Sequence, residues 1–307
     1  MKAFAHWVMK GRMQAVIAAS VLAMLGLLVT PAVLLSAAVI MLTVLRQGWR
    51  EGLLVLASAL LAIAGLGGLV FQMPIALAVL GAMLWVPAAV LGGILGKTGS
   101  LRLAIEIASI GAGLIVLAQY ASLGDPAAFW SDALNAFLSL RIDAETLANA
   151  DLGPLVELMA GWMAGGVAAT WLLGNVLSLS LARYWSALLD RPGAFGDEFR
   201  ALRFGRWLLI LVPALLVFGV ILTGGRPNLV GQLYLVGMVV FLIQGLSFAH
   251  WLVAEFSGSG AWIVGLYLLL ILVAPQSATM VALAGYADGW LNFRTRVRAR
   301  RPGAGGK

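Results

Sequence analysis

The sequence predicts an all-α fold, a polytopic transmembrane helical bundle of about ten crossings with both termini in the cytoplasm. Hydrophobic residues make up 62% of the 307 positions and charged residues only 11%, whereas about a quarter of the residues of a soluble protein are charged. Apolar runs near the length of about 20 residues that crosses a bilayer recur along the chain. Lysines and arginines gather in the short segments between these runs and at the tail, where the positive-inside rule expects them.

The first apolar run covers residues 13–45 without a single charge. It is too long for the apolar region of a cleaved signal peptide, so we expect it to be retained as membrane structure. It is also too long for one comfortable crossing. Because proline disfavours helix at the residue before it, Thr30-Pro31 predicts a break. We therefore expect two short helices, 13–29 and 32–46.

Eight further crossings follow from the remaining apolar runs. They are predicted at 52–70, 74–96, 101–122, 156–182, 206–223, 229–254, 261–274 and 276–292. The last two repeat the opening pattern, because Ala274-Pro275 interrupts a second long run. Together the crossings predict one integral membrane domain over 1–302, followed by a glycine-rich disordered tail at 303–307.

The distribution of basic residues tests this topology. Ten crossings with a cytoplasmic N-terminus leave only Arg141 and Arg226, of the 20 Lys and Arg, on the external side. Merging either interrupted run into one crossing would export a basic loop or the basic tail. The charge bias therefore favours both splits and predicts a multi-pass protein of a bacterial inner (cytoplasmic) membrane.

Two segments between crossings are long enough to fold. In the external segment 123–155, Asp125-Pro126 is typical of a helix N-cap followed by proline at the first helical position. The apolar residues after it recur at helical spacing, which fits either an amphipathic helix on the membrane surface or a cap over the bundle. In the cytoplasmic loop 183–206, Arg191-Pro192-Gly193 predicts a helix break, followed by a short helix at about 197–204.

The second half of the chain carries a family resemblance. Its motifs are Arg183-Tyr184-Trp185, Arg191-Pro192-Gly193-Ala194-Phe195, Glu198-Phe199-Arg200, Leu202-Arg203, Gln244-Gly245-Leu246 with His250, and the run 288–294. These resemble the YybS-like family of uncharacterised bacterial membrane proteins, over essentially the whole chain. That family is distantly similar to the S components of energy-coupling-factor transporters, which capture vitamins or metal ions. The resemblance implies a transport-related solute binder, although S components are six-helix units.

A solute captured from outside should meet polar side chains in the outer halves of the helices. In the predicted topology that region holds Gln72, Gln119, Tyr120, Glu157, Trp162, Asn228, Gln232 and Tyr234. We take Gln119, Glu157, Trp162 and Gln232 as the ligand-binding candidates. Asn175, inside the sixth crossing behind a glycine-rich face, is a fifth; the alternative there is a hydrogen bond that fixes helix packing.

Two groups of residues are candidates for docking a partner. Ala15, Ala19 and Ala23 give the first crossing a face of small residues that another membrane subunit could meet, and internal packing explains the pattern equally well. Arg191, Pro192, Gly193 and Phe195 predict a folded cytoplasmic elbow that docks a partner. The alternative is a plain connector.

The composition also limits the chemistry. The chain has no cysteine and two histidines, and it contains none of the paired carboxylates, His-Glu-x-x-His or Gly-x-Ser-x-Gly motifs of common enzymes. We therefore expect no catalytic residues, metal or cofactor, and no nucleic-acid binding, because the net charge of +7 is explained by topology. The expected partners are the lipid bilayer and other membrane subunits. Two functions stay open: transport-related solute binding and a non-catalytic scaffold for another membrane complex.

Overall fold

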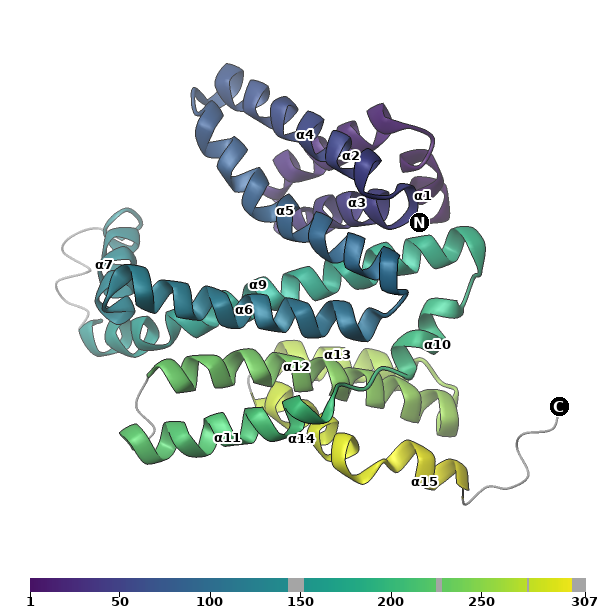
Figure 1. Cartoon of the computed structure of the whole chain (residues 1–307). Coiled ribbons are helices and arrows are strands. Elements are labelled where there is room, and N and C mark those ends of the chain that lie inside the picture. Colours follow the sequence, from purple (N-terminus) through teal and green to yellow (C-terminus); the bar gives the residue numbers. More distant parts are fainter. Residues whose placement is uncertain (143–151, 225–227, 275, 300–307) are drawn as a thin grey trace. The chain divides into compact units, whose positions relative to one another are not determined.

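The computed structural model describes residues 1–142, 152–224, 228–274 and 276–299 (Figure 1). Within these residues every regular element is a helix. The helices are α1 Lys2–Val8, α2 Arg12–Gly26, α3 Pro31–Gln47, α4 Trp49–Leu66, η1 Gly67–Phe71, α5 Pro74–Thr98, α6 Leu101–Leu123, α7 Pro126–Ser139, α9 Gly153–Asp190, α10 Ala194–Arg200, α11 Arg206–Thr223, α12 Leu229–Leu252, η2 Val253–Ser257, α13 Ala261–Leu272, α14 Gln276–Leu291 and α15 Phe293–Ala299. Arg226, Pro275, the predicted tail 303–307 and part of the predicted external segment 123–155 lie outside the described residues.

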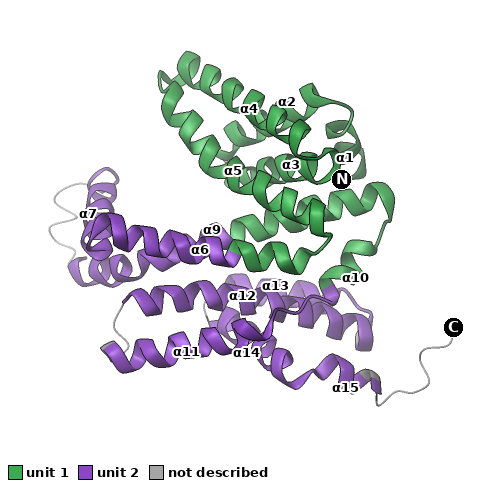
Figure 2. Cartoon of the chain, viewed as in Figure 1, with its two compact units in different colours: residues 1–108, 173–199 green, residues 109–172, 200–307 purple. Residues whose placement is uncertain are grey.

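The chain divides into two compact units, coloured separately in Figure 2. Unit 1 comprises residues 1–108 and 173–199, and unit 2 comprises residues 109–172 and 200–307. Two of the three boundaries fall within the long helices α6 and α9, which each contribute one part to each unit, and the third falls before the last residue of α10. The predicted domain 1–302 therefore contains two packed bodies.

Several helices could span a membrane, which confirms the predicted membrane-type helical bundle. Five stretches in the described residues are long and apolar enough: Trp49–Phe71, Pro74–Thr98, Leu101–Leu123, Gly153–Asp190 and Leu229–Phe256. The pair α1 and α2, bent by 118°, makes a sixth if it counts as one span. All ten predicted crossings are helical, but α13 has 12 residues, about 18 Å at 1.5 Å per residue, against a hydrocarbon core of about 30 Å. Helix lengths thus support five or six spans.

The core of unit 1 forms around α3, which begins at Pro31, one residue before the predicted helix 32–46. Residues 36–44 of α3 are all buried. Ser36 Oγ donates to the Ala19 carbonyl of α2 at 2.7 Å and accepts from Trp85 Nε1 of α5 at 2.9 Å. One hydroxyl therefore links α2, α3 and α5.

Charged side chains hold the ends of the unit 1 helices. Gly48, at φ +84°, makes the sharp turn between α3 and α4, a backbone conformation that glycine adopts without steric cost. Next to it, Arg46 donates to Asp190 at the end of α9 at 2.6 Å and to Ser186 Oγ at 3.2 Å. A second Arg46 nitrogen donates to the other Asp190 carboxylate oxygen at 3.0 Å, so the contact between the two side chains is bidentate.

Unit 2 is built on α12, which packs mainly against α14 and also against α11. Glycines allow the close approach of α12 and α14. A Cβ placed on Gly245 of α12 would overlap the carbonyl of Val281, and one on Gly285 of α14 would overlap the Phe241 carbonyl and the Gly245 nitrogen, all below 3.0 Å. The two backbones therefore touch, as small residues permit between membrane helices.

Candidate functional site

A polar cavity of about 250 Å³ lies within unit 2, where the end of α6, the start of α7, the first turns of α9 and the start of α12 converge. Its side-chain polar groups come from Tyr120, Asp125, Asn228 and Gln232. The remaining wall is small residues and backbone, including Gly161 and Ala164 of α9. A few convergent polar groups in a concave site are typical of ligand binding.

Gln232 forms the buried wall of the polar cavity. Its Oε1 accepts from the Gly165 amide at 2.6 Å, and its Nε2 donates to the Gly161 carbonyl. The approach requires glycine, because a Cβ on Gly165 would lie 2.6 Å from Gln232 Oε1. The glycine face predicted on this helix thus lets the Gln232 amide bond directly to the α9 backbone.

Gln119 of α6 bonds to the helices beside the polar cavity. Its Nε2 donates to the Ala164 carbonyl of α9 at 3.1 Å, and its Oε1 accepts from Trp130 Nε1 of α7 at 3.1 Å. Because its amide is occupied by protein groups, Gln119 shapes the site and does not line it. The helix α7 is held against α6 and α9 by this bond.

Asp125 and Tyr120 are the lining groups with capacity left for a ligand. Asp125 Oδ1 accepts from the amides of Ala127 and Ala128, which confirms the predicted cap of α7. Its second oxygen accepts no bond from the described residues. Tyr120 lines the same cavity. Asn228, in contrast, caps α12 by accepting from the Gly231 amide at 2.8 Å.

One of the five predicted ligand-binding residues, Gln232, lines the polar cavity. Gln119 lies behind the lining and bonds to Ala164, and Trp162 lies near the start of α12, since a Cβ on Gly231 would lie 3.2 Å from the Trp162 ring. Glu157 is exposed on the first turns of α9 and does not line the cavity. Asn175 belongs to unit 1. Neither Tyr120 nor Asp125 is among the five ligand-binding candidates. Tyr120 does belong to the polar residues that the sequence places in the outer halves of the helices.

The small-residue face of the first crossing is interior. Ala15 and Ala19 of α2 are buried within unit 1, and Ala23 is half-buried. The Ala19 carbonyl accepts the Ser36 hydroxyl bond. Ala15 and Ala19 therefore pack inside the unit, the alternative that the pattern left open, and docking of a partner at this face stays a prediction.

The segment at Arg191, Pro192 and Gly193 is a folded elbow. Helix α9 ends at Asp190, Gly193 takes φ +97°, and α10 begins at Ala194, three residues earlier than predicted. Phe195 lies 6.0 Å from Tyr184 and 5.9 Å from Phe199 between ring centroids. Arg183 bonds to Glu198 at 2.7 Å across the turn. The contacts fix the elbow within unit 1 and leave Arg191, Pro192 and Gly193 exposed.

A buried ionic cluster, formed by Asp288, Arg294 and Arg203, lies at the end of α14. The Asp288 carboxylate has no exposed surface. Its Oδ2 is 3.0 Å from Arg294 Nε and 3.9 Å from Arg203 Nε. Arg203 also donates to the carbonyls of Asp288 and Gly289, and Arg294 donates to the carbonyl of Arg200. The cluster joins the segment after α10 to the last helices.

Buried amide and hydroxyl groups of α12 complete this junction. Gln244 Oε1 accepts from the Phe204 amide at 2.9 Å, and its Nε2 donates to the Gly285 carbonyl at 2.6 Å. Ser247 Oγ donates to the Leu202 carbonyl at 3.1 Å. The junction thus unites motifs from distant parts of the sequence. An aspartate inside an apolar run is the signal that could have identified it.

Neither the polar cavity nor the buried ionic cluster resembles a metal centre. The residues that the structure describes contain no group of three or more His, Asp or Glu side chains placed to hold a metal ion. The chain matches no known protein family, no curated protein and no solved structure.

Proposed function

We propose that this chain is a multi-pass protein of a bacterial inner membrane, similar to the YybS-like proteins, that binds a small polar solute in the polar cavity. The observation that carries the proposal is the convergence of Tyr120, Asp125, Asn228 and Gln232 on one cavity of about 250 Å³. In the proposed topology of ten crossings this cavity lies on the external side. A solute binder of the S-component type needs such a site.

The chemistry of the lining narrows the class of solute. Asp125 is the one formally charged side chain that lines the cavity among the described residues, and no described arginine or lysine does. The volume corresponds to about eight water molecules at roughly 30 Å³ each. We therefore propose a small neutral or cationic solute, with a donor group directed at the Asp125 carboxylate and the Tyr120 hydroxyl.

Two conservative substitutions test the site. In wild-type protein, a panel of small amines and neutral polar metabolites should contain a solute that raises the melting temperature, because a ligand at 100 times its Kd adds about 2.7 kcal/mol to the free energy of unfolding. Asp125→Asn keeps a residue that caps helices well but removes the charge. Tyr120→Phe keeps the ring and removes the hydroxyl. Both should reduce solute-dependent stabilisation, measured by thermal unfolding in detergent, while the ligand-free protein stays folded.

A matched control lies on the same helix. Asp132→Asn makes the same change at an exposed position of α7 that does not line the cavity, so its solute-dependent stabilisation should equal that of the wild type. The proposal fails if no solute in the panel stabilises the wild type. It also fails if Asp125→Asn and Tyr120→Phe respond like the Asp132→Asn control.

Reporter fusions test the topology that the proposal requires. Fusions after residues 72 and 140 should give an external signal, and fusions after residues 50 and 195 a cytoplasmic one, because the Lys and Arg bias retains basic segments in the cytoplasm. The measurement is the paired activity of a reporter active only outside and one active only inside. A cytoplasmic signal after residue 140 would place the polar cavity on the wrong side and contradict the orientation.

A scaffold for another membrane complex is the second candidate function. The observation that favours it is α13, an apolar helix of 12 residues with no buried residue, which exposes Trp262 and Leu272. Affinity purification in mild detergent with mass spectrometry separates the two functions. A co-purifying membrane complex, combined with no solute-dependent stabilisation, would favour the scaffold.

A further inference from the structure

One end of unit 1 is a surface rich in basic side chains, which we call the basic end. Helix α1, the start of α2, the end of α3, the start of α4, the end of α5 and the end of α9 lie together there. Side-chain contacts join these parts in pairs: Phe4 with Trp185, Arg12 with Glu51, Trp49 with Gly93, and Arg46 with Asp190. Unit 1 contains nine Lys and Arg against five Asp and Glu, so it carries an excess of positive charge.

Five basic side chains of the basic end are left without a counter-charge. Three arginines there each bond to a carboxylate: Arg12 to Glu51, Arg46 to Asp190 and Arg183 to Glu198. Five further side chains are exposed and form no ion pair among the residues that the structure describes: Lys2, Lys10, Arg50, Lys97 and Arg191. They belong to the same helix ends or to the segments beside them, so their charges add at one surface.

Helix α1 packs one face against unit 1 and exposes a tryptophan on another. Ala5 and Val8 are fully buried, and the Phe4 ring lies 5.3 Å from the Trp185 ring of α9 between centroids. Trp7 is 37% exposed. The chain turns by 118° between α1 and α2, so α1 does not extend α2 and instead lies against the end of α9.

An exposed apolar stripe on α2 begins where the basic segment ends. Its members recur every four residues, and each is at least 44% exposed: Met13, Ile17, Val21 and Leu25. Residues four apart lie on one face of a helix. Lys10 and Arg12 come immediately before the stripe. A change from charged to apolar surface within a few residues is typical of a helix that enters a membrane at the headgroup level. This arrangement favours a lipid surface over a soluble polyanion as the partner of the basic end.

Exposed lysine and tryptophan side chains are together typical of a surface that meets lipid headgroups. Tryptophan favours the level of the headgroups, and lysine extends its charge toward them along an apolar stem. A basic residue near an anionic membrane surface strengthens binding by about fivefold. The positive-inside rule accounts for the side of the membrane on which basic residues stay, but it requires neither an exposed tryptophan nor unpaired cations gathered at one set of helix ends.

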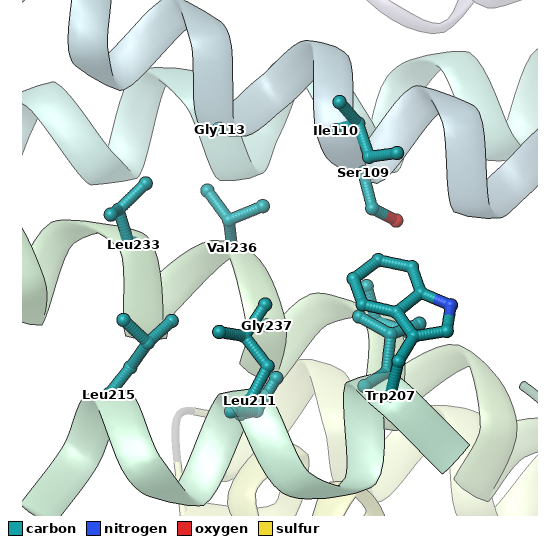
Figure 3. A pocket seen from close by; sticks show the side chains of 12 residues that line it. Ser109, Ile110, Gly113, Trp207, Leu211, Leu215, Leu233, Val236 and Gly237 are labelled. Carbon is teal, nitrogen blue, oxygen red and sulfur yellow. The ribbon is translucent and has the colours of Figure 1, made fainter. Parts of the chain in front are cut away.

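An apolar cavity in unit 2 differs from the basic end. It has a volume of about 170 Å³ and is enclosed by α6, α11 and α12 (Figure 3). Its lining is apolar apart from Ser109 and the Trp207 indole. Because no charged side chain of the described residues lines this cavity, it offers no group that would select one headgroup over another, whereas the basic end offers five.

We propose that the basic end of unit 1 binds the headgroups of anionic phospholipids, with α1 lying in the headgroup layer of the membrane. The unpaired cations select an anionic headgroup over a zwitterionic one, and Trp7 anchors α1 at the boundary between headgroups and acyl chains. In the proposed topology the basic end faces the cytoplasmic leaflet. The surface belongs to unit 1 and the polar cavity to unit 2, and lipid binding does not depend on solute binding.

Fluorescence quenching in lipid vesicles tests the proposal. Because the chain has no cysteine, a single cysteine in place of Ala3, which is exposed on α1, can carry a fluorophore in the full chain. Vesicles of phosphatidylcholine contain a small share of spin-labelled phosphatidylglycerol or spin-labelled phosphatidylcholine as the quencher. Phosphatidylglycerol should reach half-quenching at a mole fraction at least about fivefold lower. At about 1 M salt, where the screening length falls to about 3 Å, this preference should largely disappear.

Matched variants separate the basic end from general effects of charge. The double variant Lys2→Gln, Lys10→Gln should bring the two half-quenching mole fractions close together, because two unpaired cations next to the label are lost. The double variant Arg141→Gln, Arg296→Gln makes the same change of net charge at two exposed positions of unit 2 and should keep the wild-type preference. A fluorophore on a cysteine in place of Asn135, exposed on α7, should be quenched equally by both lipids.

The proposal is overturned if the two lipids quench the label at residue 3 equally, or if neither lipid quenches it, since α1 would then face water. It is also overturned if the preference survives about 1 M salt, where surface charges are screened. The same holds if Lys2→Gln, Lys10→Gln behaves like Arg141→Gln, Arg296→Gln, or if the label at residue 135 shows the same preference as the label at residue 3.

Discussion

Replacing Gly245 by alanine is expected to prevent unit 2 from folding. The new Cβ would overlap the carbonyl oxygen of Val281, which belongs to the backbone of α14 and cannot rotate away. Overpacking of a well-packed core costs typically 1–3 kcal/mol, roughly, and a backbone clash leaves no rotamer change as relief. We expect a loss of folding free energy above about 3 kcal/mol. The measurement is the yield of monodisperse protein and the midpoint of unfolding by sodium dodecyl sulfate.

The controls make the same substitution at glycines of the same unit. Gly265→Ala on α13 and Gly166→Ala on α9 add a Cβ that meets nothing within 4 Å. Because alanine is favoured over glycine inside a helix by about 1 kcal/mol, both should be neutral or stabilising. Wild-type stability of Gly245→Ala would show that α12 and α14 do not touch as described.

Asp288→Asn is expected to cause the second-largest loss of stability. The carboxylate is fully buried and lies 3.0 Å from Arg294 Nε, so removing its charge leaves a buried guanidinium without its counter-charge. Breaking one side of a buried ion pair costs about 3–5 kcal/mol. The substitution preserves volume, and the midpoint of unfolding in detergent should therefore report the electrostatic loss.

A control and a double variant separate this effect from a generic one. Asp132→Asn at the exposed position on α7 should change stability by no more than about 0.5 kcal/mol. The double variant Asp288→Asn, Arg294→Gln should lose less than the sum of the single losses, because contacting residues are not additive. Additive losses would show that the two side chains act independently.

The buried ionic cluster brings together segments that lie far apart in the sequence. Members of the segments 198–203, 244–250 and 288–294 meet at one junction. Gln244 bonds to the amide after Arg203, and Asp288 pairs with Arg294. These motifs thus describe one packing arrangement, and we assign them to stability, whereas the polar cavity carries the proposed solute binding.

The sequence by itself determined the class of fold and the location of nearly every helix. Apolar length predicts where a chain can enter a bilayer, and local chemistry predicts where a helix starts. Helix α3 begins at Pro31, one residue before its predicted start, and Asp125 caps α7 as expected, because proline position and side-chain capping depend on neighbours a few residues away. The length of α13 was overestimated, since hydropathy continues past the last helical residue.

Only the tertiary structure decided which helices pair, and therefore which polar residues meet. Gln232 reaches the backbone at Gly161 and Gly165 from 67 or more residues away, a contact that no local pattern encodes. The same holds for Ala19, whose small side chain fits internal and external packing equally well until α3 is seen to cover it. Periodicity and composition are local properties, whereas a cavity or an ion pair depends on which helices become neighbours. Many pairings of similarly apolar helices satisfy the same sequence pattern, and side-chain packing selects one.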